Sequence, residues 1–308
     1  MRVSCLMGLA MLLAAAPASA QVFRAGVEMV SLGVTIADKA GTLVTGLTPD
    51  DFLVLEDGVP QDVRLFVDGQ TATGDRPPLH IGLLFDTSGS METDLAMART
   101  AAVRFCNVLS RAEDITLVDF DTEVRVARFG QNDFPRFVER LRNRKPDGWT
   151  ALYDALGVYL DGTAFQDGEK VVVVYTDGAD TRSVMTFKDT ITGLKAADVT
   201  VYVVGFLGHQ RGRGGIEQRL RLMQLAEATG GTAFFPSSQK DIDKAYAQVL
   251  DEVNARYTLG YVSTNTRGDG AWRKVDVKLV RPDLKQTEIR SRKGYYSVLR
   301  HTGARGEP

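Results

Sequence analysis

Between residues 79 and 256 the chain alternates short apolar runs with longer amphipathic segments. Apolar runs at 81–85, 115–120, 171–175 and 199–206 predict strands, and helical spacing predicts helices over 91–109, 134–141, 151–160, 187–197, 216–228 and 242–253. Three of the runs are apolar at nearly every position, which is typical of strands buried on both faces. We therefore expect an α/β fold: a doubly wound, mostly parallel sheet, with an antiparallel edge hairpin at 119–128.

The two flanks of this core show a different pattern, in which every second residue is apolar. Alternating segments lie at 30–36, 53–55, 63–67, 257–261 and 275–279. Asp57-Gly58 is a hairpin dipeptide that would return the chain into 63–67, and 265–270 would turn between the last two segments. Each flank alone has too few strands to bury a face. We expect residues 21–70 and 255–299 to pair into one small β domain.

The first twenty residues read as a targeting segment. Met1 and Arg2 precede an apolar stretch at 6–16, and Ala18-Ser19-Ala20 has the small-residue pattern of a secretory cleavage site. The apolar stretch is shorter than the roughly 20 residues that span a bilayer. We expect a cleavable signal peptide over 1–20, export to the periplasm or the medium, and no transmembrane segment in the mature chain.

The remaining boundaries follow from composition. Residues 71–79 contain glycine and two prolines and are expected to form a linker, 80–254 the α/β domain, and 300–308 a disordered polar tail. With 44% hydrophobic and 25% charged residues and a net charge of −2, the 308-residue chain has the composition of a soluble globular protein. Basic clusters at 136–145 and 211–213 are interpreted as a solvated helix face and a surface loop, so no nucleic acid partner is expected.

Cysteine usage excludes an internal disulfide in the mature chain. Cys5 lies in the predicted signal peptide, which leaves only Cys106. Because Cys106 sits in the apolar stripe of a predicted helix, we expect a buried packing role.

The candidate chemistry begins where the first core strand ends. The turn Asp86-Thr87-Ser88-Gly89-Ser90 offers a carboxylate and two hydroxyls between a strand and a helix. Such hard oxygen donors are the ligands that Mg²⁺ prefers. Two later segments could complete the set, since Thr150 offers a hydroxyl and Asp177 follows another core strand.

These five residues predict a divalent metal site at the carboxyl edge of the sheet, where ligands collect in open α/β folds. Mg²⁺ is favoured, with Mn²⁺ and Ca²⁺ as alternatives. Two aspartates neutralise the ion formally, so it could accept one more carboxylate from a partner. Asp180 could position the ligands without binding the ion itself, although the favoured interpretation is that it is a solvated loop carboxylate.

Each residue also has a purely structural interpretation. The Ser88, Ser90 and Thr150 hydroxyls could cap the helices that follow them. The dipeptide Asp177-Gly178 could form a turn and nothing more. Their joint occurrence, in order and at strand ends, favours the metal site over four separate coincidences.

The order Asp86, Ser88, Ser90, Thr150, Asp177 matches all five positions of the metal-ion-dependent adhesion site of von Willebrand factor type A domains. Residues 80–254 therefore resemble that family. Segments 47–52, 56–61, 257–261 and 294–296 further resemble the secreted, acidobacterial-type bacterial proteins called VWFA-related. The resemblance implies a Rossmann-like metal-binding domain. It also implies adhesion or protein assembly more than catalysis, and it names no partner.

The favoured function is an exported, non-enzymatic module whose metal binds an Asp or Glu side chain of a protein partner. One alternative is a metal-dependent hydrolase. Against it, Ser88 lies outside a Gly-x-Ser-x-Gly elbow, and His80, His209 and His301 lack metal-ligand spacing. A phosphotransferase of the Asp-x-Asp type would need aspartate at position 88. A third alternative is a structural envelope protein with a degenerate site.

Overall fold

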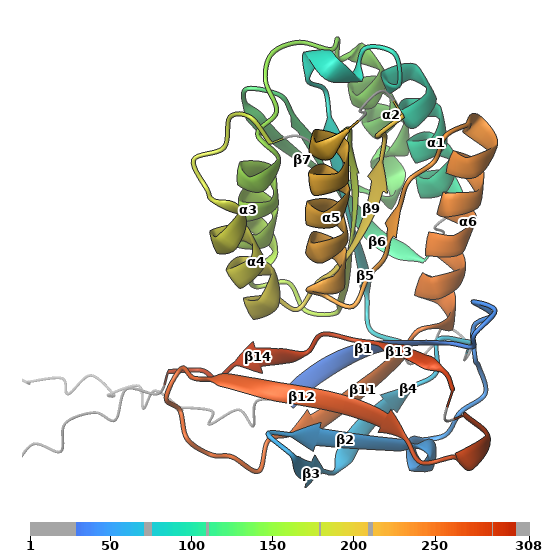
Figure 1. Ribbon diagram of the computed structural model, residues 1–308, viewed down its shortest axis with the longest axis vertical. Helices are drawn as coiled ribbons and strands as arrows, with labels where there is room; N and C mark the ends of the chain where they lie inside the picture. The colour runs from blue at the N-terminus through green and yellow to red at the C-terminus, as the bar shows by residue number, and fades with distance from the viewer. Residues whose placement is uncertain are drawn as a thin grey trace, which may run out of the picture.

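The protein is described by a computed structural model that covers residues 29–70, 76–108, 111–178, 180–208, 212–284 and 286–299. The predicted signal peptide, most of the predicted linker and the predicted tail lie outside these residues. Figure 1 shows a layered α/β part standing on a smaller part made of strands, with α6 (Gln239–Ala255) leading directly from one to the other.

A six-stranded sheet forms the centre of the α/β part, in the order β10-β9-β8-β5-β6-β7. Its strands are β5 (Leu79–Asp86), β6 (Ala112–Phe120), β7 (Val124–Gly130), β8 (Glu169–Thr176), β9 (Thr200–Gly205) and β10 (Ala233–Phe234). All neighbours are parallel except β7, which returns antiparallel to β6 at one edge. The predicted fold class and the predicted edge hairpin are therefore confirmed.

Continuous apolar sequence explains why the middle strands are central. Every residue of β5 and β9 is buried, and so are all but the first residue of β8. Their valines, leucines and isoleucines pack against helices on both faces, as a parallel sheet requires. Gly82 in β5 marks one close approach, because a Cβ there would lie 2.4 Å from the ring of Tyr159.

Three helices cover each face of the sheet. The helices are α1 (Leu95–Val108), α2 (Phe134–Asn143), α3 (Leu152–Thr163), α4 (Phe187–Ala196), α5 (Arg213–Glu227) and α6. One core cluster joins α1, α2 and α6 to the sheet, and a second joins α3, α4 and α5 to the opposite face. This two-sided cover is the doubly wound arrangement that the sequence predicts.

The first helix begins later than its pattern predicts. Residues Gly89–Met91 form a short 3-10 helix, η2, a turn follows, and α1 starts only at Leu95. Across these residues the backbone bonds span three residues, since Glu92 donates to Gly89 and Asp94 donates to Met91, and the Gly89 N–H donates to the Gly148 carbonyl of another loop at 3.2 Å.

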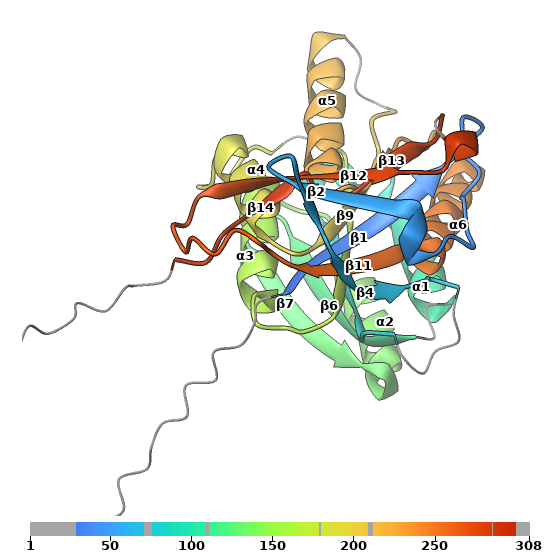
Figure 2. The ribbon, with the colours of Figure 1, turned by 90° about the horizontal axis from the view of Figure 1, so that it is seen from below.

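The flanks together form two four-stranded sheets packed on a common core (Figures 1 and 2). The strands are β1 (Met29–Ala37), β2 (Phe52–Glu56), β3 (Val59–Gln61), β4 (Val63–Val67), β11 (Tyr257–Val262), β12 (Trp272–Leu279), β13 (Glu288–Arg290) and β14 (Gly294–Tyr296). The strand orders are β13-β1-β11-β4 and β14-β12-β2-β3. Because β1 pairs with β11 and β12 with β2, the expectation that the two flanks build one β part is confirmed.

Two details of the predicted strand pairing are wrong. Across Asp57-Gly58 the returning strand is β3, whereas β4 crosses to the other sheet and pairs with β11. Likewise β11 and β12 lie in different sheets, so residues 265–270 connect the sheets instead of turning a hairpin. Alternation shows which face of a strand is buried, but both sheets bury the same kind of face, so the pattern does not assign a partner.

Charged side chains join the β part to the amino-terminal edge of the central sheet. Glu252 of α6 pairs with Arg290 at 2.8 Å, and Glu169 of β8 accepts from Thr258 of β11 at 2.8 Å. The direct step from α6 to β11 leaves one residue, Arg256, between helix and strand. This interface lies at the opposite end of the strands from the candidate metal site.

Three smaller findings complete the fold. Cys106 is buried in the core, as expected. His80 lies near the start of β5, between the Asp114 carboxylate at 3.1 Å and the Asp167 carbonyl at 2.9 Å, in a structural role.

Among the described residues, no helix has both the length and the apolar character needed to cross a bilayer.

Candidate functional site

Asp86 is the last residue of β5 and is completely buried. Its Oδ1 accepts a hydrogen bond of 2.9 Å from the Ser88 amide, and its Oδ2 accepts one of 2.6 Å from the Thr176 hydroxyl. Burial raises the pKa of this carboxyl to about 7, against the lowering by these hydrogen bonds, and the charge of Asp177 raises it further. The carboxylate therefore sits where a cation would stabilise its charged form.

Asp177 follows the neighbouring strand and completes a carboxylate pair. β5 and β8 run parallel with Phe85 opposite Tyr175, so both strands deliver an aspartate to the same edge of the sheet. Asp177 is 6% exposed, and its negative charge makes a small further contribution to the raised pKa of Asp86. Gly178 then turns the chain with a φ of 97°, which favours glycine.

The two serines lie on the turn directly after Asp86. Ser88 is buried and Ser90 exposed, and their hydroxyl oxygens are 3.1 Å apart. Ser88 occupies the N-cap position of η2, yet its side chain makes no capping hydrogen bond. Capping therefore does not account for the Ser88 hydroxyl, which points instead to its serine neighbour.

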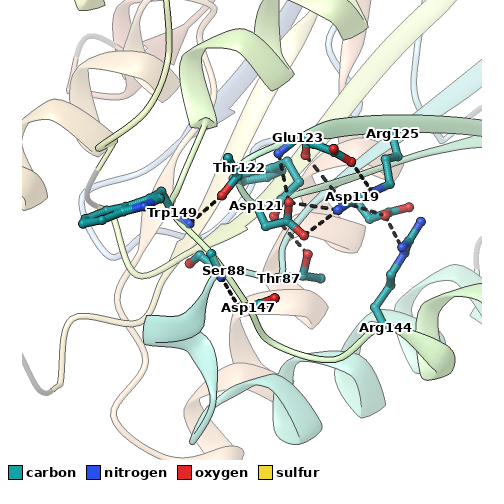
Figure 3. Close-up of polar contacts among 12 residues, drawn as sticks. Thr87, Ser88, Asp119, Asp121, Thr122, Glu123, Arg125, Arg144, Asp147 and Trp149 are labelled. Atoms are coloured by element: carbon teal, nitrogen blue, oxygen red, sulfur yellow. Dashed lines mark hydrogen bonds and ion pairs between the residues drawn. The ribbon is translucent and has the colours of Figure 1, made fainter.

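Thr150 comes from a loop that lies against this turn (Figure 3). The Asp147 amide donates to the Thr87 carbonyl at 2.9 Å, and the Gly89 amide donates to the Gly148 carbonyl at 3.2 Å. Thr150 is 3% exposed, and the N-cap residue of α3 is Ala151, so the predicted capping role of Thr150 is not observed.

A third loop, between β6 and β7, fixes the Thr150 loop from its other side. The Trp149 amide donates to the Thr122 hydroxyl at 2.9 Å, and the Ala151 amide donates to the Asp121 carbonyl at 2.9 Å. Gly148 has a φ of 72°, and a Cβ there would lie 2.4 Å from the Thr122 hydroxyl. Only glycine fits between these loops, so the backbone before Thr150 is held rigidly.

Asp180 is not the solvated carboxylate that we favoured from the sequence. It is half-buried, and its Oδ2 accepts hydrogen bonds from the Tyr153 amide at 2.9 Å and the Ser183 hydroxyl at 2.5 Å. The first turn of α3 has free amides that attract a carboxylate. Thr181 adds to this junction, because its hydroxyl accepts from the Thr150 amide at 3.0 Å. Asp180 thus supports the loop that carries Thr150.

The basic cluster at 136–145 is also not simply a solvated helix face. Arg140 and Arg144 approach the Asp119 carboxylate at 2.7 and 2.8 Å, and Arg125 approaches it at 3.6 Å. The Asp119 side chain is 1% exposed, so its charge requires partners. Figure 3 shows Arg144 and Arg125 converging on it beside the site. Helical spacing alone does not show this role, because the carboxylate that the arginines contact belongs to another element, strand β6.

The structure brings the predicted residues to one edge through three linked loops. The described residues contain no group of three or more His, Cys, Asp or Glu side chains that could hold an ion. The candidate set instead has two carboxylates, with hydroxyls for the rest, which suits a small hard cation that keeps some water. No ion pair to Asp86 occurs within the part of the chain that the structure describes, so a cation would meet an uncompensated charge.

Sequence reasoning missed the residues that hold this edge together. Thr176, Thr181 and Thr122 each place a hydroxyl on a candidate ligand or its loop. Thr176 had a detectable signal, since it is a polar residue that directly precedes Asp177 at the end of an apolar run.

Comparison with known families gives one clear match. The sequence model of the von Willebrand factor type A domain matches residues 80–248, which is more than half of the chain. No curated protein matches the chain.

Among solved structures, a von Willebrand factor type A protein from Catenulispora acidiphila is 15% identical, with a TM-score of 0.50. The match covers 89% of this chain and 64% of that one, so this chain spans less than two thirds of that protein. An aerotolerance-related membrane protein from Bacteroides fragilis is 15% identical over 57% of this chain and 98% of that one, with a TM-score of 0.46. The domain of a type V pilus tip protein from Porphyromonas gingivalis is 12% identical over 58% and 96%, with a TM-score of 0.47. At these identities the likeness concerns the fold alone.

Proposed function

This chain belongs to the von Willebrand factor type A domain family, and on that premise we propose that it is an exported protein-binding module that works through a divalent metal ion. The ion, with Mg²⁺ favoured, would be held by Asp86, Ser88, Ser90, Thr150 and Asp177. Its open position would accept the carboxylate of an Asp or Glu side chain from a protein partner.

The observation that carries the proposal is the pair of aspartates at the ends of two adjacent parallel strands. Asp86 is fully buried, the charge of Asp177 contributes to its raised pKa, and its hydrogen-bond donors among the described residues are the neutral groups of Ser88 and Thr176. A buried carboxylate whose pKa is raised by burial is stabilised in its charged form by a nearby cation. A metal ion would provide that positive charge at Asp86 and supply an electrophilic centre for an outside oxygen ligand.

The surroundings support binding over catalysis. The Ser88 hydroxyl is hydrogen-bonded to Ser90, and no histidine accompanies it within the described part of the chain. His80 lies at the far end of β5, bonded to Asp114. A serine nucleophile needs a base within hydrogen-bonding reach, so the hydrolase alternative lacks its second residue there.

Export remains part of the proposal, based on the sequence of residues 1–20. Removal of the predicted signal peptide, which contains Cys5, would leave the buried Cys106 as the remaining cysteine, and this is compatible with an oxidising compartment because no disulfide has to form.

Metal binding is tested by calorimetric titration of Mg²⁺, Mn²⁺ and Ca²⁺ into chelator-treated protein. We expect saturable one-site binding that disappears in Asp177→Ala. Asp133→Ala is the matched control, since Asp133 forms a surface pair with Arg136 away from the site. Binding that is unchanged in Asp177→Ala would reject the proposed ligands.

Partner binding is tested with an array of acidic peptides from exported proteins, probed with labelled protein in Mg²⁺ or in EDTA. We expect some spots to bind only in Mg²⁺, and to lose binding when their Asp or Glu is replaced by the amide. Binding that survives EDTA and amide replacement would contradict a metal-bound carboxylate.

A further inference from the structure

A second candidate site lies where the α/β part meets the β part, away from the metal ligands. A groove of about 540 Å³ runs between helices α4 and α5 on one side and β12 on the other. Figure 1 shows α4 and α5 standing over β12 and β14 in this region. A volume of this order is within the range of ligand-binding clefts.

The floor of the groove is apolar. Phe187 and Ile191 come from α4 and Trp272 from β12, and each is only partly buried. The Trp272 indole packs closely against β14. Its Cζ2 lies so near Gly294 that a Cβ there would be only 2.4 Å away, and the Tyr296 ring makes an edge-to-face contact with 5.0 Å between the ring centroids. A fixed aromatic surface loses little conformational freedom on binding.

The rim of the groove is basic. Lys195 of α4, Lys274 of β12 and Lys293 before β14 converge on it from three separate elements. Lys274 also pairs with Asp276 at 2.9 Å, but such an exposed pair is weak and exchangeable. Glu227 is the single carboxylate in the lining, so the groove carries a local excess of positive charge.

We propose that this groove binds an acidic segment of a partner protein, with carboxylates at the lysines and one large apolar side chain on Trp272 and Phe187. Charge complementarity selects the acidic segment, and the open groove between a helix pair and a strand leaves room for a peptide. Residues 300–308 of this chain do not match, because they carry two arginines against one glutamate. The binding needs no metal, so it goes beyond the function proposed above.

Tryptophan fluorescence gives a direct test. The chain has two tryptophans, so Trp149→Phe leaves Trp272 as the reporter of the groove. The probe is the peptide Asp-Glu-Phe-Glu-Asp with blocked ends, titrated in EDTA so that a metal site does not contribute. We expect a saturable change in Trp272 emission, and at least about tenfold weaker binding of the peptide Asn-Gln-Phe-Gln-Asn.

Charge reversal sharpens the test. Lys195→Glu with Lys293→Glu should weaken the acidic peptide about tenfold or more and favour Lys-Arg-Phe-Arg-Lys instead. The matched control is Lys240→Glu with Lys244→Glu, two exposed α6 positions outside the groove, which should change neither affinity.

Three outcomes would overturn the proposal: no emission change with the acidic peptide, equal binding of its amide counterpart, or binding that survives charge reversal. Tighter binding of oligogalacturonate than of the peptide would also overturn it, by identifying an acidic polysaccharide as the ligand. Failure here would leave Mg²⁺ titration of the Asp86 site unchanged, so the two proposals are tested separately.

Discussion

The Thr176 hydroxyl donates a 2.6 Å hydrogen bond to Oδ2 of Asp86, and so joins the ends of two adjacent strands at a completely buried carboxylate. The bond lowers the pKa of Asp86 in an environment where burial raises it. Thr176 therefore keeps the carboxylate oriented and closer to its charged form, which is the form that a metal ion requires.

Thr176→Val should weaken metal binding without removing any proposed ligand. Loss of one hydrogen bond to a charged group costs about 1.5–3 kcal/mol, which corresponds to roughly tenfold or more in affinity. Calorimetric Mg²⁺ titration measures the change. Thr116→Val, in a buried position of β6, is the control that should leave affinity unchanged. Equal affinities for wild type and Thr176→Val would contradict the role given to this hydroxyl.

The raised pKa of Asp86 predicts how metal-free stability depends on pH. Because the folded pKa of about 7 lies above the ordinary value of 3.8 for an aspartate, the folded state binds the proton more tightly than the unfolded state between these values. The free energy of unfolding should therefore fall as pH rises from 4 to 7, by up to about 1.4 kcal/mol per pH unit from this group. Above about pH 7 this contribution should level off.

Urea denaturation in EDTA at a series of pH values measures this dependence. The difference between wild type and Asp86→Asn isolates the one carboxyl group from the rest of the protein. Saturating Mg²⁺ should reverse the trend, because protons then compete with the ion and stability should rise with pH. A wild-type curve parallel to that of Asp86→Asn would show that Asp86 is not perturbed.

Asp119→Ala should destabilise the fold by about 3 kcal/mol, because it leaves Arg140 and Arg144 facing each other without their shared carboxylate. The two arginine side chains are 30% and 34% exposed, so water offsets part of the loss. Asp133→Ala removes an exposed pair with Arg136 and should cost less than about 1 kcal/mol. Urea denaturation of both variants provides the comparison, and similar costs would mean that Asp119 is not a structural anchor.

Burial raises the pKa of the Cys106 thiol, so it should resist thiol reagents in the native state. At pH 8 an aromatic disulfide reagent should label Cys106 of the mature chain slowly in buffer and rapidly in denaturant. Because the slow rate reflects opening of α1, destabilising variants such as Asp119→Ala should label faster. Rapid labelling of the native wild type would contradict the packing of Cys106.

The sequence was most informative where one interaction dominates a segment. The buried runs of β5, β8 and β9 depend on hydrophobic burial, so their existence and their place in a mostly parallel sheet could be predicted. The same is true of helices α2 to α6, whose apolar stripes face the sheet. The bounds were less exact: α5 begins at Arg213, three residues before the predicted start.

Features that depend on distant partners could not be predicted from the local pattern. The crossing of β4 to the sheet of β11 depends on how two similar apolar faces are shared. The pairing of Arg140 with Asp119 joins residues from different elements, and the capping of α3 by Asp180 comes from a later loop. In the last two cases a polar contact between distant segments, which periodicity does not show, holds a side chain that the local pattern places in solvent.

The most direct test of the metal centre is an anomalous difference map from a crystal of this protein soaked in Mn²⁺. We predict one strong peak at the ends of β5 and β8, at about 2.1–2.3 Å from oxygens of Asp86, Ser88 and Ser90. Thr150 and Asp177 should be further ligands of the ion, bound to it directly or through water. The absence of a peak there, or a peak at Asp119 and Asp121 instead, would contradict the account.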